Sequence, residues 1–170
     1  MDKNIKAFVG SIAYPKSEAL IVPANAVGLM SRGQITKLIE DGGGQAIADE
    51  AKKAVVKDKP EVGNCFVTGV GKLKRRGVKQ IYHAVIRRFP NDFTSSIEVI
   101  DTLNRTMKRV IADGWKSVTV CGLAIEPGEL DISVMASEIV LTCEKYSGKI
   151  DIKIIDGNKE FIDEVNKKLG

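Results

Sequence analysis

The sequence has few of the residues that mark specialised classes of protein. Its 170 residues include three cysteines, one histidine and one tryptophan. Cys65, Cys121 and Cys143 are odd in number and widely spaced, with no Cys-x-x-Cys pair. This spacing excludes a zinc ribbon and favours free thiols in a reducing compartment. We therefore expect a cytoplasmic protein with no metal and no cofactor.

Long apolar segments are also missing. No run approaches the roughly 20 residues that a membrane helix needs, and Met1–Asn4 lacks the apolar core of a signal peptide. We expect no membrane partner. The net charge of +4 and the pI near 8.9 suit a small anionic ligand, but the excess is too small to imply nucleic-acid binding.

The composition is that of an ordinary globular protein, with 44% hydrophobic and 28% charged residues. A chain of this length buries roughly two thirds of its unfolded surface. We find no internal repeat, low-complexity tract or linker. The sequence therefore predicts a single domain over residues 1–170.

Short apolar runs alternate with amphipathic patterns along the chain. This rhythm predicts an α/β protein, a three-layer α/β/α sandwich with a central mixed sheet of about six strands. The predicted strands are Ile5–Val9, Glu18–Asn25, Cys65–Val70, Gln80–Ile86, Ser117–Gly122 and Ile150–Ile155, and the predicted helices are Gln34–Asp41, Gln45–Lys57, Ser95–Asp113, Ile132–Tyr146 and Lys159–Leu169.

The stretch from Glu18 to Ile35 has the pattern of an α/β ligand site. An apolar run bounded by Pro23 predicts a buried strand, and a turn of small residues then leads into a helix. Ligands of α/β proteins collect at the carboxyl ends of strands and beside helix starts. Asn25 lies where the strand ends, so its amide either faces a ligand or only turns the chain.

This stretch resembles the ADP-ribose-binding macro domain, whose strand reads roughly Asp-Ala-Ile-Val-Asn-Pro-Ala-Asn before a Gly-rich loop. Three further segments match in order: Val9-Gly10-Ser11-Ile12, Gly63-Asn64-Cys65-Phe66-Val67-Thr68-Gly69 and Tyr82-His83-Ala84-Val85. The resemblance covers most of the chain. It implies a macro-like fold whose cleft lies over the strands that end at Asn25, Ile86 and Gly122.

The resemblance also implies how a nucleotide would lie in the cleft. Ser11 replaces an Asp that recognises adenine, with help from the backbone of Ile12, and a hydroxyl bonds the base more weakly than a carboxylate. Val22 replaces the first Asn of the strand. Asn25 keeps the second, which contacts the distal ribose in relatives.

Two loops take the place of the family's phosphate-binding loops. Arg32 has entered the first loop, where it either blocks the cleft or offers a guanidinium to a phosphate. The second loop contains Glu126, Glu129 and Asp131, and these carboxylates are unfavourable beside a pyrophosphate. The residues assigned to phosphate binding by the resemblance are Arg32, Gly33, Gln34, Ile35, Gly122, Leu123 and Ala124.

The function implied is binding of ADP-ribose or a related nucleotide phosphate, with hydrolysis of ADP-ribosyl esters by a ribose-bound water as its catalytic form. An interaction module is a further alternative. It would use Lys72–Arg76 of the basic loop Lys72–Gly77, with Arg87 and Arg88, to dock an acidic partner.

A thiol-dependent esterase is the remaining alternative. His83 has the side chain suited to proton transfer near neutrality. Antiparallel pairing of the strands that hold Cys65 and His83 would bring these two residues close. Cys121 ends a strand that the family order places one strand away from that of His83, with small Ala24 between them. Either thiol would then form a Cys–His dyad, whereas the other reading makes His83 structural.

Overall fold

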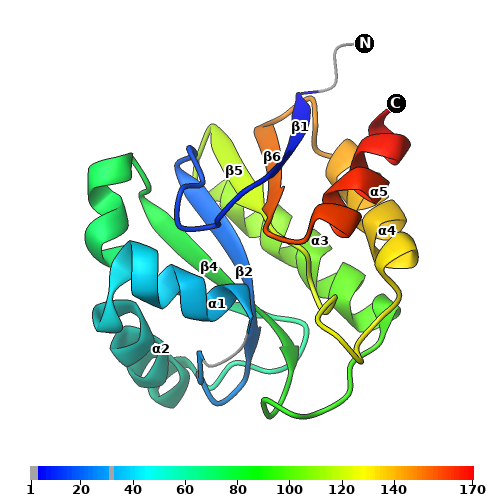
Figure 1. The fold of residues 1–170 in the computed structure, drawn as a ribbon. Helices are drawn as coiled ribbons and strands as arrows, with labels where there is room; N and C mark the ends of the chain where they lie inside the picture. The colour runs from blue at the N-terminus through cyan, green and yellow to red at the C-terminus, as the bar shows by residue number, and fades with distance from the viewer. Residues whose placement is uncertain (1–3, 31–32) are drawn as a thin grey trace.

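The computed structural model describes residues 4–30 and 33–170. Its centre is a six-stranded sheet in the order β1-β6-β5-β2-β4-β3, with helices on both faces (Figure 1). The strands are β1 (Ile5–Val9), β2 (Ala19–Asn25), β3 (Cys65–Thr68), β4 (Gln80–Arg87), β5 (Ser117–Val120) and β6 (Asp151–Asp156).

The pairing makes the sheet mixed. Strands β1, β6, β5, β2 and β4 run parallel to their neighbours, and β3 pairs antiparallel with β4. The predicted three-layer α/β/α sandwich is therefore confirmed. Because five carboxyl ends meet at one edge of the sheet, the loops that follow β2, β4 and β5 lie together there.

Two groups of helices cover the two faces of the sheet. Helices α1 (Gln34–Lys37) and α2 (Gln45–Asp58) lie on one face, and α3 (Ser96–Ala112), α4 (Ile132–Glu144) and α5 (Lys159–Leu169) lie on the other (Figure 1). The middle strand β2 is buried on both faces, so Ala19, Leu20, Ile21 and Val22 are each 0% exposed. This burial explains why β2 reads as a continuous apolar run.

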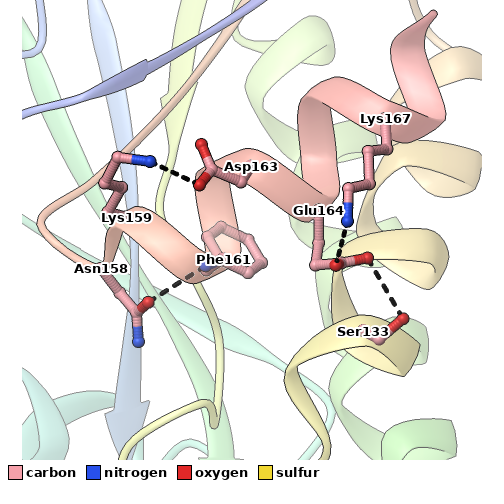
Figure 2. Close-up of polar contacts among 7 residues, drawn as sticks. All are labelled: Ser133, Asn158, Lys159, Phe161, Asp163, Glu164 and Lys167. Atoms are coloured by element: carbon pink, nitrogen blue, oxygen red, sulfur yellow. Dashed lines mark hydrogen bonds and ion pairs between the residues drawn. The ribbon is translucent and has the colours of Figure 1, made fainter.

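Helix α5 closes the fold against α4. The side chain of Asn158 accepts a hydrogen bond of 3.0 Å from the backbone N–H of Phe161, whose ring is fully buried (Figure 2). The Glu164 carboxylate accepts two hydrogen bonds, one of 3.0 Å from Nζ of Lys167 and one of 3.4 Å from the hydroxyl of Ser133 in α4. Exposed pairs of this kind contribute little, so the cap and the buried ring hold the helix in place.

The predicted helix Gln34–Asp41 is wrong in its form and its end. The α-helix stops at Lys37, and a π-helical segment, η1 (Leu38–Gly43), continues it. The end of η1 lies against Gly71, in a close contact between two glycines. A Cβ on Gly71, which has a φ of +50°, would lie 2.3 Å from the carbonyl oxygen of Gly43.

The predicted basic loop Lys72–Gly77 is instead a 3₁₀-helix, η2 (Gly71–Arg76), with Leu73 in the core. Arg76 donates a hydrogen bond of 2.5 Å to the carbonyl of Ala13 and stacks over the ring of Tyr14. One of the cations assigned to an interaction surface therefore has a structural role. In the part of the chain that the structure describes, no helix is long and apolar enough to cross a bilayer.

Candidate functional site

A small cleft lies over the carboxyl ends of β2, β4 and β5, where the resemblance places it. Its volume is about 70 Å³. The predicted residues on its wall are Asn25, Ile35, Gly122 and Ala124, together with Cys121 from the dyad hypothesis. Further lining comes from Pro23, Ala24, Leu29, Ile86, Arg87, Pro90, Ile125, Glu126 and Glu129.

Asn25 lines the cleft with its amide engaged by its own loop. The side-chain nitrogen donates to the carbonyl of Leu29 at 2.9 Å, and the side-chain oxygen accepts from the Leu29 N–H at 3.1 Å. These bonds close the turn that follows β2. The turn-forming role open to an Asn at this position is thus present, and a ligand would meet an amide that is held rigidly.

Gly122 is tied to the neighbouring strand. Its N–H donates to Oδ2 of Asp156 at 2.8 Å, and Oδ1 of the same carboxylate accepts from the N–H of Asn158 at 2.8 Å. Asp156 is 1% exposed. The N–H of Gly122, expected from the resemblance to hold a phosphate, is therefore already bonded to a buried carboxylate.

The rest of the second loop turns one side chain inward. Leu123 is fully buried in the core. Ala124 adopts a φ of +58°, and its carbonyl accepts from the N–H of Leu130 at 3.0 Å. This bond closes the loop back toward the start of α4. Of Leu123 and Ala124, only Ala124 lines the cleft.

Ser11 and Ile12 are not among the residues that line the cleft. The Ser11 hydroxyl accepts from the N–H of Ala13 at 3.1 Å, and Ile12 is fully buried. They follow β1, and the N–H of Gly10 donates to the carbonyl of Asp156 at the end of β6. Ser11 and Ile12 therefore lie on the β1–β6 side of the cleft.

The first loop meets the carboxylate of Glu126. A Cβ on Gly33, which has a φ of +53°, would lie 2.0 Å from Oε1 of Glu126. The second loop therefore places a negative group against the first at the position expected for a phosphate. Arg32, predicted to block the cleft or to bind a phosphate, lies outside the described residues, and the Gln34 side chain is likewise not described.

Arg87 is a cleft residue that the site prediction missed. Its guanidinium donates to Oε1 of Glu129 at 2.5 Å, and the side chains of Arg87 and Glu129 are 10% and 16% exposed. The signal for Arg87 was its position after the β4 apolar run, at the same sheet edge as Asn25. Because Arg87 is held in the cleft, it is not part of an exposed basic surface with Arg88.

His83 is buried at 1% exposed on the α2 face of the sheet. Its Nε2 lies 2.9 Å from the Thr68 hydroxyl, and its ring stacks on Phe66 with centroids 4.6 Å apart. Burial lowers the pKa of His83 to about 3. The imidazole is thus neutral near pH 7 and bonded to a threonine.

Cys65 does not share a face with His83. The β3–β4 register pairs Phe66 with His83 and Cys65 with Ala84, so the pleat points the thiol and the imidazole to opposite faces. Burial raises the pKa of Cys65, with a smaller opposing effect from Arg109 of α3. The described geometry brings this pair into no contact.

Cys121 shares a face with His83 but is not its neighbour. β2 pairs Val22, rather than the expected Ala24, with His83, and Cys121 follows the Ile21–Val120 pair. Two strand spacings of about 4.8 Å therefore separate the backbones, with Val22 between them. The thiol contacts the Ile21 carbonyl at 3.8 Å, and burial raises its pKa well above the usual value.

These environments predict the order in which the thiols react. Cys65 is half-buried, whereas Cys121 and Cys143 are 1% and 0% exposed. We expect iodoacetamide to alkylate Cys65 about tenfold faster or more than the other two, because buried thiols react only on local opening. The rates, read by peptide mass spectrometry, should still rise above pH 9, since burial raises the pKa of each thiol.

The matched control is His83→Gln, which should leave the order and the pH dependence of alkylation unchanged. A different pattern would restore the dyad: Cys121 or Cys65 modified rapidly at pH 6 to 7, with the selectivity lost in His83→Gln.

Within residues 4–30 and 33–170 no cluster of three or more His, Cys, Asp or Glu residues is arranged to hold a metal ion.

Comparison with known proteins assigns this architecture to a family. The Macro domain family model matches residues 21–138. An uncharacterized protein of Aquifex aeolicus (strain VF5) is 30% identical over 169 residues, which make up 98% of each chain. The chain belongs to the Macro domain family.

Solved structures show the same fold at low sequence identity. The macrodomain of Mycobacterium tuberculosis DarG has a TM-score of 0.76 and 20% identity, over 91% of this chain and 98% of that one. A macrodomain variant of Oceanobacillus iheyensis with ADPR has a TM-score of 0.82 and 15% identity, over 99% and 93%. The macrodomain of that organism with ADP has a TM-score of 0.80 and 15% identity, over 99% and 91%.

Proposed function

We propose that the cleft over β2, β4 and β5 binds ADP-ribose or a related nucleotide phosphate. The observation that carries this proposal is the mostly buried side chain of Arg87 on the wall of a cleft at the carboxyl edge of a macro-domain sheet. A guanidinium binds phosphate through paired, charge-assisted hydrogen bonds. The solved relatives with ADPR and ADP support the ligand class.

The order of the strands supports one direction for the ligand. Ser11 follows β1 at one edge of the sheet, Gly122 follows β5, and Asn25 ends the central strand β2. A ligand with its base near Ser11 and its distal ribose near Asn25 would cross β6 and β5 on the way. Its phosphates would then lie between Gly33 and the loop after Gly122, whose Glu129 is bonded to Arg87.

The carboxylates of the second loop oppose this ligand. Glu126 lies against Gly33, and Glu129 is bonded to Arg87. The cleft of about 70 Å³ is well below the roughly 300 Å³ or more of typical ligand sites. Binding would therefore require residues 126–129 to move, so that ligand phosphates replace the two carboxylates.

This competition predicts that removing one charge strengthens binding. We expect Glu126→Gln to bind ADP-ribose about tenfold more tightly than the parent chain, because a unit charge near a phosphate at a partly exposed site opposes binding by roughly 1–4 kcal/mol. Titration calorimetry with ADP-ribose measures both affinities. Asp151→Asn, at the exposed start of β6, is the charge-matched control and should bind as the parent does.

Two results would argue against these statements separately. Absence of heat at millimolar ADP-ribose for the parent and for Glu126→Gln would remove the proposed ligand. Equal affinity in the two proteins would keep the ligand and show that Glu126 does not compete with its phosphate.

We extend the proposal to hydrolysis of ADP-ribosyl esters by water. The buried, neutral His83 and the raised pKa of Cys121 favour a water nucleophile over a thiolate. Release of ADP-ribose from an ester-linked ADP-ribosylated protein should then be unchanged in Cys121→Ser. Loss of release in this variant, with ADP-ribose affinity retained, would favour a thiol mechanism.

A further inference from the structure

A second cavity adjoins the cleft on its β4 side. Its volume is about 190 Å³. The loop after β4 contributes Asn91, Phe93 and Thr94 to its wall, and the second loop contributes the Pro127–Gly128 turn. None of these residues was assigned to a site by the sequence, and none lines the first cleft.

One ion pair separates the two cavities. Arg87 and Glu129 line both of them. Their bond of 2.5 Å and their low exposure make the pair a partition between the two spaces. If a ligand phosphate or ribose drew Arg87 away from Glu129, the cleft and the second cavity would form one longer groove, closer in size to typical ligand sites.

The wall of the second cavity holds a hydroxyl without a partner. Oγ1 of Thr94 is buried and has no hydrogen-bond partner among the described residues. A buried polar group in this state is uncommon in native proteins and is costly, so it calls for an explanation. A ligand atom that bonds this hydroxyl would supply one.

The same wall presents an aromatic ring to solvent. Phe93 is 99% exposed, although burial of a phenylalanine side chain is normally favourable. A ring this exposed gains contact area when a planar group stacks on it. Phe93 and Thr94 therefore provide one stacking surface and one hydrogen-bonding group side by side in the sequence.

We propose that the second cavity is a subsite for a planar, amide-bearing ring attached to the terminal ribose of the ligand. This inference rests on the proposed function, since it takes the distal ribose to lie near Asn25. The sheet order places β4 immediately beyond β2, so the second cavity lies beyond that ribose. The chemistry of the subsite matches a pyridinium carboxamide such as the nicotinamide of NAD⁺.

Three contacts would distinguish this ring from other groups. Its face stacks on Phe93, its amide bonds the hydroxyl of Thr94, and its positive charge lies near the carboxylate of Glu129. A cation over an aromatic ring adds a further attraction. ADP-ribose carries only a hydroxyl at the position of the ring, so it fills the first cleft and leaves these contacts unmade.

The test compares NAD⁺ with ADP-ribose by titration calorimetry on the whole chain. We expect NAD⁺ to bind about tenfold more tightly. Phe93→Ala and Thr94→Val should each reduce NAD⁺ affinity by about threefold to tenfold and leave ADP-ribose affinity unchanged. Val56→Ala, which removes a side chain that is 76% exposed on α2, is the control and should change neither.

The outcomes separate this inference from the function on which it rests. Binding of ADP-ribose with equal or weaker binding of NAD⁺ would overturn the subsite and leave the proposed function standing. Absence of binding by both ligands would overturn both. Thermal unfolding of Thr94→Val without ligand is an independent test. A raised melting temperature would support the absence of a hydrogen-bond partner for the Thr94 hydroxyl, because the buried polar group is removed, and a lowered one would contradict it.

Discussion

The free energy of unfolding should fall by about 2–3 kcal/mol between pH 6.5 and pH 4.5 through His83 alone. Burial lowers the pKa of His83 to about 3 in the folded chain, against an ordinary value of 6.5. The unfolded chain therefore takes up a proton in this interval while the folded chain does not. Stability is present in full above pH 6.5 and is lost at about 1.4 kcal/mol per pH unit below it, down to about pH 3.

The measurement is urea unfolding at several pH values for the parent and for His83→Gln. Glutamine keeps a group able to bond the Thr68 hydroxyl, which lies 2.9 Å from the imidazole. The free energy of unfolding of the variant should fall less steeply as the pH is lowered, because residue 83 no longer titrates. The carboxylates titrate alike in both proteins, so the difference between the two profiles reports His83. Parallel pH profiles would show that His83 titrates at an ordinary pKa, which would contradict its burial as a neutral side chain.

Replacement of the buried Asp156 should have a similarly large effect. Its two carboxylate oxygens accept from the N–H groups of Gly122 and Asn158, each at 2.8 Å. In Asp156→Asn one of these N–H groups faces an amide nitrogen instead of an oxygen. We expect the variant to be about 3 kcal/mol less stable, because a hydrogen bond to a charged group contributes roughly 1.5–3 kcal/mol and an unpaired buried donor adds to the loss.

For a chain of this length such a loss lowers the melting temperature by roughly 6–12 °C. Asp151→Asn, at the exposed opposite end of the same strand, is the matched control and should melt within a degree or two of the parent. The second loop should also lose its position, so Asp156→Asn should weaken any ADP-ribose binding. An unchanged melting temperature would show that the loop is held by other contacts.

The placement of Asp156 explains a difference between the expected and the observed site. The Gly122 N–H was assigned to a phosphate from the resemblance, and the structure gives it to this carboxylate. Asp156 is 34 residues away in the chain. No local pattern connects the two positions, because they meet only through the parallel pairing of β5 and β6.

The strands and most of the helices followed from local pattern. Helix α3 has Ser95 at its N-cap, with the Ser95 hydroxyl accepting from the N–H of Glu98, and apolar residues at three- and four-residue steps. Such caps and periods are written in neighbouring residues, so they can be read without knowing the fold. The π-helical form of η1 was not read from such a pattern, and the end of η1 at Gly43 lies against Gly71, a contact between segments far apart in the chain.

The dyad hypothesis shows the limit of reasoning from strand order. The Cys65–His83 form of the hypothesis required β3 to pair antiparallel with β4, and this pairing is present. The register was not predictable from the sequence, and it places Cys65 and His83 on opposite faces. A shift of one residue would reverse this result, since side chains alternate along a strand.

By itself, the sequence determined the family, the α/β/α architecture and the sheet edge where the cleft lies, because these depend on hydrophobic period, turns and motif order. Only the tertiary structure decided which groups face the cleft. It bonded Asn25 to Leu29, set Glu126 against Gly33 and placed the Arg87–Glu129 pair between two cavities. These contacts join distant loops, and their geometry depends on register and packing that no local pattern encodes.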